Sequence, residues 1–214
     1  IITFLTTKER IIPQSDQESS IIQDLKDLVK NKPWLSMLII TIFVFITLAL
    51  KGGMYVYFFK DYLSETAQAT FLENIGFNHF IDSLNQFLIN LGFVGFRWPE
   101  DPQTSAFSLF NASGIIMMII GIGFSKSLAD RFGKRDVFGT SLFLSALCLL
   151  VFYFLSPESI GLVFTTQLIH GFFYGISTPL LWAMIADVAD YSEWKNHRRA
   201  TAIIFSAMIF GLKA

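Results

Sequence analysis

Four long apolar runs constrain this chain more than any other feature of its sequence. A helix needs about 20 apolar residues to cross the hydrocarbon core of a bilayer. The runs reach that length and occupy residues 34–59, 106–125, 137–155 and 160–186. Hydrophobic residues make up 53% of the chain, and its mean hydropathy of +0.53 is too high for an ordinary soluble domain. The sequence therefore predicts an all-α, polytopic membrane helix bundle.

A fifth apolar segment, residues 200–214, is too short to span a bilayer as it stands, and we expect it to be the first part of another membrane helix. The chain begins with "IITFL", with no initiator methionine and no basic region before an apolar stretch. A cleaved signal peptide is therefore not expected. We interpret the chain as an internal piece of a larger protein.

The segments between the runs differ in charge. Basic residues gather in segments 1–33, 126–136 and 187–199, whereas Arg97 is the only Lys or Arg in the outer segment 60–105 beyond its first residue. Cytoplasmic loops of membrane proteins carry an excess of Lys and Arg. The pattern predicts a multi-pass protein of the cell membrane, inner or plasma, with residues 1–33 and the other basic segments cytoplasmic and the outer segment extracellular.

Two connecting segments have an amphipathic pattern. In "IIQDLKDLVKNKPW" the apolar residues share one helical face, which we expect along the inner membrane surface or against the cytoplasmic ends of the bundle. Asn31 fits the N-cap of the next helix and Pro33 its first turn. The outer loop repeats apolar residues every three or four positions, at Phe77, Phe80, Ile81, Leu84, Phe87, Leu88 and Leu91. This spacing predicts a helix that packs on the membrane surface, or alternatively a lid over a cavity.

Two lysines lie where charge is costly. An ionisable group inside a bilayer costs several kcal/mol, so it usually faces a cavity or a partner. Lys51 stands beside two glycines late in the first run, where its long side chain could extend outward to the membrane surface. Lys213 lies about thirteen residues beyond the Arg198–Arg199 pair, near mid-membrane. Lys213 is therefore the stronger candidate for a functional charge.

The fourth run is irregular and ends in acidic residues. Gly171, Gly175 and Pro179 interrupt it, and Pro179 removes one backbone hydrogen bond. Trp182 follows within a turn and could either stack on a ligand ring or pack in the core. Asp187, Asp190 and Glu193 lie close in sequence to Arg198 and Arg199, so they form either ion pairs between helices or a solvated charged loop.

The remaining reactive side chains indicate no chemistry. Cys148 lies inside an apolar run and is interpreted as a small core residue. His79, His170 and His197 fall in an outer loop, a helix and an inner loop, with no spacing that assembles a metal or catalytic centre. A membrane-embedded enzyme is therefore not expected, and nothing indicates a nucleic-acid partner.

Several motifs resemble a known family. "SLADRFGKRDV" resembles the cytoplasmic loop signature of the major facilitator superfamily, with Lys126 in place of the usual opening glycine. "ADVADYSEWKNHRRATAIIFSAMIFGLKA" resembles the stretch that joins helices ten and eleven of the glycoside-pentoside-hexuronide cation symporters, the group of the melibiose permease. "TTKERIIPQ", "DLKDLVKNKPW" and "KGGMYVYFFKDYL" resemble the middle loop and helix seven of that group.

The resemblance implies that the chain is the C-terminal half of a twelve-helix symporter, from the end of helix six into helix eleven. Helices seven to ten would be the four runs. The expected partners are a sugar or glycoside, a coupling cation, the lipid bilayer and the N-terminal half of the same transporter. Sodium is the expected cation, with its main ligands in that other half, and no cofactor or metal site is expected in this chain.

The resemblance also implies residue roles. Lys213 and Trp182 match residues that line the sugar pocket. Arg131, Asp187, Asp190 and Arg199 match charges that close the cytoplasmic side in the outward-open state. Met208 and Ile209 replace polar sugar contacts of the melibiose permease, so melibiose is not the expected sugar. The alternatives are a proton-coupled or facilitative sugar transporter, or a lysolipid carrier of the same fold.

Overall fold

The computed structural model describes residues 21–93, 101–196 and 201–213, and for residues 21, 23–25 and 211–213 it describes the backbone alone. All regular elements in the described residues are helical. In chain order they are α2 (Ile21–Lys30), α3 (Lys32–Tyr57), the π-helical turn η1 (Phe58–Tyr62), α4 (Glu65–Asn74), α5 (Phe77–Asn90), α6 (Pro102–Phe132), α7 (Lys134–Phe152), α8 (Ile160–Asn196) and α9 (Thr201–Lys213).

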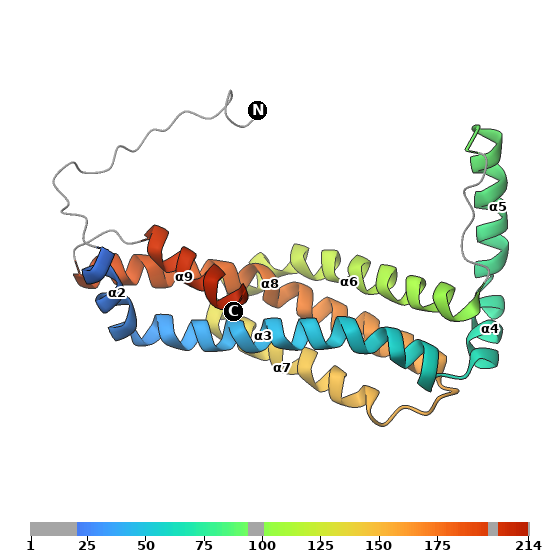
Figure 1. Cartoon of the computed structure of the whole chain (residues 1–214), viewed down its shortest axis with the longest axis horizontal. Coiled ribbons are helices and arrows are strands. Elements are labelled where there is room, and N and C mark those ends of the chain that lie inside the picture. Colours follow the sequence, from blue (N-terminus) through green and yellow to red (C-terminus); the bar gives the residue numbers. More distant parts are fainter. Residues whose placement is uncertain (1–20, 94–100, 197–200, 214) are drawn as a thin grey trace.

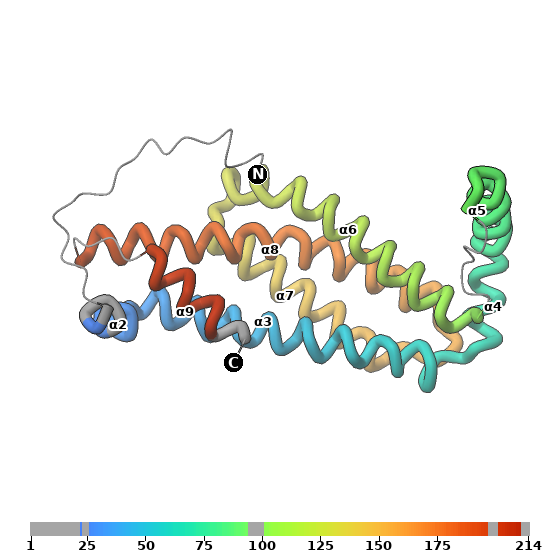
Figure 2. The backbone as a smooth tube through the Cα atoms, turned by 45° about the horizontal axis from the view of Figure 1, so that its top comes forward, coloured from blue at the N-terminus to red at the C-terminus, as the bar shows by residue number. Residues whose placement is uncertain are grey.

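Four helical segments are long and apolar enough to cross a membrane, and they contain the four apolar runs except for residues 153–155, which follow the end of α7. They are α3 continued by η1, α6, α7 and α8, while α9 is a shorter apolar helix. They run side by side along the molecule (Figure 1), and the tube in Figure 2 shows α9 lying against the first half of α3. The predicted all-α membrane helix bundle is confirmed.

The helices extend beyond the apolar runs into the charged segments. Where the sequence suggests a loop over residues 187–199, the described part, residues 187–196, continues α8. Most of segment 126–136 is helical too, because α6 ends at Phe132 and α7 begins at Lys134. Gly133 alone separates these two helices, with a φ of 87° that L side chains rarely adopt. A helix can continue past the apolar core into water with its backbone hydrogen bonds intact, so charged side chains at its end do not require a loop.

Glycines bring α6 and α8 into close contact. A Cβ on Gly175 of α8 would overlap the carbonyl oxygen of Met118, and one on Gly121 of α6 would overlap the carbonyl oxygen of Phe172. A Cβ on Gly171 would lie 2.6 Å from the carbonyl oxygen of Gly114. Small residues spaced in this way let membrane helices pack backbone to backbone. The glycines that interrupt the fourth run therefore form its interface with α6.

Two apolar cores lie at opposite ends of the bundle. One core joins α2, the start of α3, the start of α7, the second half of α8 and α9, and includes Met37, Phe138 and Ile185. The other joins the end of α3, η1, α4, the start of α6, the end of α7 and the start of α8, and includes Phe59 and Phe110. On each long helix, the residues between these two cores occupy the middle of the bundle.

The first core anchors α2, whose predicted apolar face is divided. Leu28 is buried in that core, whereas Ile22 and Val29 are 68% and 70% exposed. Asn31 caps α3 as predicted, since its side chain accepts a hydrogen bond of 3.2 Å from the N–H of Trp34. This cap fixes the sharp turn from α2 into α3.

At the other end, α4 packs under the bundle and α5 leaves it. Buried Gln68 on α4 donates to the carbonyl oxygen of Phe59, 2.9 Å away in η1. Figure 1 shows α5 running across the direction of the bundle, at the end opposite to α2. None of its residues is buried, and Phe80 and Phe87 are exposed. A helix with exposed apolar side chains that lies across a membrane bundle fits the predicted interfacial helix better than a lid.

The same end holds the start of α6. Asp101 is its N-cap and accepts hydrogen bonds from the hydroxyl group and the N–H of Thr104. The two bonds hold the pKa of the exposed Asp101 carboxyl below its ordinary value, and the bond from the Thr104 hydroxyl has the larger effect.

The contact between α6 and α8 predicts that adding one methyl group lowers the stability of the protein at one glycine and not at another. Gly175→Ala should lower the stability by about 1 to 3 kcal/mol, because the methyl group would force two backbones apart. Gly123→Ala on α6 is the matched control, since a Cβ there meets nothing within 4 Å. It should leave the stability unchanged or raise it slightly. Melting temperatures in detergent measure both, and equal values for the two variants would contradict the close contact.

Candidate functional site

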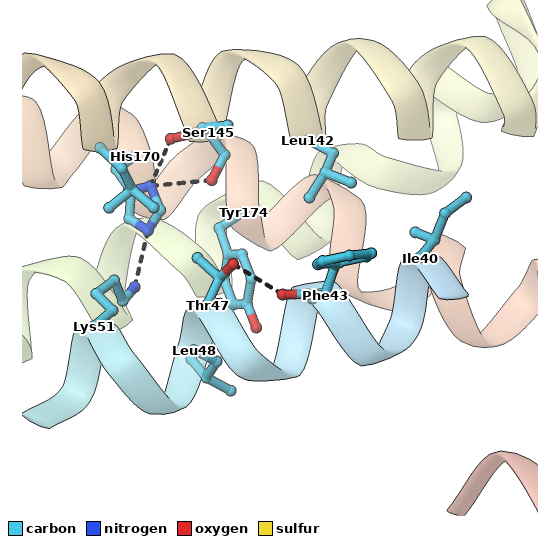
Figure 3. A pocket seen from close by; sticks show the side chains of 12 residues that line it. Ile40, Phe43, Thr47, Leu48, Lys51, Leu142, Ser145, His170 and Tyr174 are labelled. Carbon is cyan, nitrogen blue, oxygen red and sulfur yellow. Dashed lines mark hydrogen bonds between the residues drawn. The ribbon is translucent and has the colours of Figure 1, made fainter. Parts of the chain in front are cut away.

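A polar cluster lies in the middle of the bundle, where α3, α7 and α8 meet. Nζ of Lys51 lies 2.8 Å from Nε2 of His170. The other ring nitrogen of His170, Nδ1, lies 3.0 Å from Oγ and 3.1 Å from the carbonyl oxygen of Ser145. Figure 3 shows the three side chains in line, one from each helix. His170 is 2% exposed. These contacts form a continuous hydrogen-bonded chain inside the membrane-spanning part.

Helical periodicity explains the placement of each member. On α3, Lys51 follows Thr47 and precedes Tyr55 at intervals of four residues. On α8, Gln167, His170 and Tyr174 follow one another at intervals of three and four residues. Residues three or four apart share a helix face. Both sets therefore face the line along which α3 meets α8. On all three helices the cluster falls between the residues of the two apolar cores.

Aromatic rings surround the ammonium group of Lys51. Its Nζ lies 5.3 Å from the ring centre of Tyr174 and 5.7 Å from that of Tyr55. Both distances allow a cation–π interaction, which stabilises a charged ammonium. The ring of His170 stacks on Tyr174 at 5.9 Å. The Tyr55 hydroxyl in turn lies 3.5 Å from Oε1 of Gln167. Lys51 therefore points inward, and the expectation that it extends outward to the membrane surface is wrong.

A cavity of about 270 Å³ lies beside the cluster (Figure 3). Lys51, Ser145 and His170 are among its polar lining residues, and most of the remaining wall is apolar, including Phe43 and Leu142. A charged group with an apolar cavity on one side has little water to solvate it. The charge of Lys51 therefore depends on the protein groups that contact it.

The residues predicted to bind substrate lie elsewhere. Trp182 is on α8 and 38% exposed. It is twelve residues past His170, so roughly 18 Å along the helix at about 1.5 Å per residue. Lys213 is the last residue of α9, and its side chain lies outside the described residues. Met208, five residues before it, is fully buried in the first core, whereas Ile209 is exposed. The structure does not bring Trp182 into the Lys51 cluster.

Among the charged residues predicted to close the cytoplasmic side, Asp187 has a partner that the sequence did not indicate. Asp187 accepts two hydrogen bonds, of 2.7 and 2.8 Å, from Nζ of Lys134 at the start of α7. Both side chains are about half exposed. The guanidinium of Arg131 lies 5.2 Å from the ring centre of Phe132. Asp190 is exposed, and Arg199 lies outside the described residues. Within the described part of the chain, the partner of Asp187 is therefore Lys134.

Sequence reasoning missed His170. Its spacing to the other histidines indicates no site, and its partner Lys51 is 119 residues away in the sequence. The available signal was the position of both residues: each is a basic side chain within an apolar run of spanning length. Two such side chains in one bundle can satisfy each other, but the sequence does not show which face each occupies.

Comparisons with known proteins agree with this architecture. The family described as MFS/sugar transport protein matches residues 101–214. A protein of Escherichia coli K12 that bears the name glycoside/cation symporter YagG is 26% identical over 99% of this chain and 38% of its own length. The inner membrane symporter YicJ of the same organism is 25% identical over 98% of this chain and 37% of its own length.

A third relative, the isoprimeverose transporter of Lactiplantibacillus pentosus, is 25% identical over 99% of this chain and 36% of its own length. This chain therefore spans less than two fifths of these curated relatives. No solved structure matches it. The family match covers more than half of the chain and includes the charged signature between α6 and α7. With its four spanning helices, the chain belongs to the MFS/sugar transport protein family and is part of a multi-pass inner-membrane protein.

Proposed function

We propose that this chain is part of a secondary active transporter that couples the uptake of a sugar or glycoside to a cation by alternating access. The observation that carries the proposal is the family match, together with similarity over nearly the whole chain to proteins named as symporters and as a sugar transporter. Those relatives are longer than this chain. The complete transporter would then include a second half that faces this one.

Alternating access requires a substrate site near the middle of the membrane, around which the two halves rock. A cation drives accumulation only if it favours the state that also binds substrate, and this linkage is reciprocal. We propose sodium as the coupling cation, with its main ligands in the part of the transporter outside this chain. A protein of this kind is a transporter and not an enzyme.

Within this chain, we propose that Trp182 and Lys213 contribute to the substrate site. Trp182 is 38% exposed and lies about one turn beyond Pro179 within α8. Such a ring can stack against the apolar face of a sugar. Lys213 would lie near mid-membrane by its position along α9. Its ammonium can donate hydrogen bonds to sugar hydroxyl groups.

We further propose that charged residues at the inner end form a gate that breaks in each transport cycle. The residues are Arg131, Asp187, Asp190 and Arg199, and the pairing of Asp187 adds Lys134. An exposed ion pair contributes up to about 1 kcal/mol. That free energy is small enough for the pair to open in every cycle.

Uptake of labelled sugars by vesicles that contain the complete transporter tests the proposed function. An inward sodium gradient should drive accumulation of a glycoside, pentose or uronide, and collapse of the gradient should abolish it. If a proton gradient or the sugar gradient alone drives uptake, sodium is not the coupling cation. Uptake of a labelled lysolipid without uptake of any sugar would identify a lipid carrier of the same fold.

The substrate role of Lys213 has its own variant in this assay. Lys213→Ala should weaken sugar binding at least tenfold, because a group that bonds the sugar within the membrane would be lost. Lys126→Ala is the control, since Lys126 is almost fully exposed on α6. Unchanged sugar affinity and unchanged cation dependence in Lys213→Ala would contradict the role.

Labelling of an introduced cysteine tests the gate. Ala183→Cys places a thiol one turn inside Asp187 on α8. Addition of Lys134→Ala or Asp187→Ala should raise its labelling rate from the cytoplasmic side by up to about fivefold, since one exposed ion pair is lost. Lys126→Ala, which breaks the exposed pair with Asp130 along α6, should have no effect. Equal labelling in all four backgrounds would show that the pair does not gate access.

A further inference from the structure

Lys51 and His170 are two basic side chains that share one hydrogen bond. A protonated lysine donates hydrogen bonds and accepts none, and a protonated histidine donates from both ring nitrogens. Two donors that face each other cannot form the 2.8 Å bond between Nζ and Nε2. The pair therefore carries at most one positive charge. Loss of that proton leaves it neutral.

Ser145 can satisfy His170 in both of these states. With Lys51 protonated, Nε2 accepts from the ammonium, and the hydrogen on Nδ1 is donated to the Ser145 carbonyl oxygen, 3.1 Å away. With Lys51 neutral, Nε2–H donates to the amine, and Nδ1 accepts from the Ser145 hydroxyl, 3.0 Å away. One residue thus offers both an acceptor and a donor to the same ring nitrogen. The hydrogen-bonded chain stays complete when the proton leaves.

No acidic side chain holds Lys51 in its charged state within the described residues. The titratable groups around the pair are Tyr55 on α3, Tyr174 on α8 and the Cys148 thiol on α7, which interacts electrostatically with Tyr55. The rings of Tyr55 and Tyr174 favour the charged ammonium. The apolar cavity wall opposes it. Neither state is therefore fixed by a permanent counter-charge, as an aspartate partner would fix it.

We propose that Lys51 and His170 form a proton-binding site within the membrane, and that its protonation controls transport. The site binds one proton, on Nζ of Lys51. When that proton leaves, the hydrogen on the His170 ring moves from Nδ1 to Nε2. Only the proton enters or leaves, so no other reactant is needed. The control of transport rests on the proposed function. The existence of the proton-binding site does not.

Nitrogen NMR of the purified transporter with ¹⁵N-labelled histidine tests the site without any substrate. His170 should keep one hydrogen from about pH 5 to about pH 9 and move it from Nδ1 to Nε2 as the pH rises. Exposed His79 on α5 gives an internal reference signal from outside the cluster. The assignment of His170 comes from His170→Asn. A single tautomer throughout, or a doubly protonated His170, would overturn the site.

The pH profile of uptake tests the control of transport. Lys51→Arg keeps a positive charge at every pH, and Lys51→Met has none. Both variants should flatten the pH dependence of wild-type uptake, at two different levels. Lys60→Arg and Lys60→Met change an exposed lysine in η1, which continues α3, and should keep the wild-type profile. A wild-type midpoint in Lys51→Met would overturn control by this site.

Ser145→Ala separates proton binding from a packing role. This variant removes the hydroxyl donor used by the neutral pair and keeps the carbonyl acceptor used by the charged pair. The midpoint of the uptake profile, and of the His170 tautomer change, should therefore move to higher pH by about half a unit to one unit. A purely structural role for Ser145 would lower activity without moving the midpoint, and that result would contradict the two-state scheme.

The NMR assay and the uptake assay test different proposals, so a negative result in one does not decide the other. A tautomer change without uptake of any sugar would leave the proton site standing and overturn the proposed sugar transport. Sugar uptake without a tautomer change would do the reverse.

Discussion

The close contact between α6 and α8 is the constraint on which the rest of the bundle depends. Gly121 and Gly175 let the two backbones approach until no side chain fits between them. In a membrane the lipid is as apolar as the helices, so close van der Waals packing must hold helices together. The contact sets the position of α8, and α8 in turn supports α3, α7 and α9.

The position of α8 explains why the polar cluster forms. Gly171 and Gly175 face α6, whereas His170 and Tyr174, one residue before each of them, are turned by about 100° to the line between α3 and α7. The helix thus has one face for packing and an adjacent face for polar contacts. With both faces occupied, His170 has little freedom to turn away from Lys51.

The two ends of the bundle differ in their side chains and packing. At the end with α2, charged residues extend the helices beyond the apolar core, and Lys134 joins α7 to α8 through Asp187. At the end with α4, aromatic rings pack closely around Phe59 and Phe110. Under the proposed function, the charged, half-exposed end would be the one that opens, because exposed ion pairs break more easily than packed aromatic rings separate. That division accords with the proposed gate, which stays a prediction.

Much of this architecture followed from local sequence. Apolar length determined the four spanning helices, Asn31 and Pro33 determined the start of α3, and the charged motif between α6 and α7 indicated the family. These features depend on neighbouring residues, so a single sequence contains them. Only the tertiary structure decided that Lys51 points inward, that Asp187 pairs with Lys134, and that His170 meets both Lys51 and Ser145. Those contacts depend on how helices are rotated about their axes, and rotation is set by packing between residues far apart in the chain.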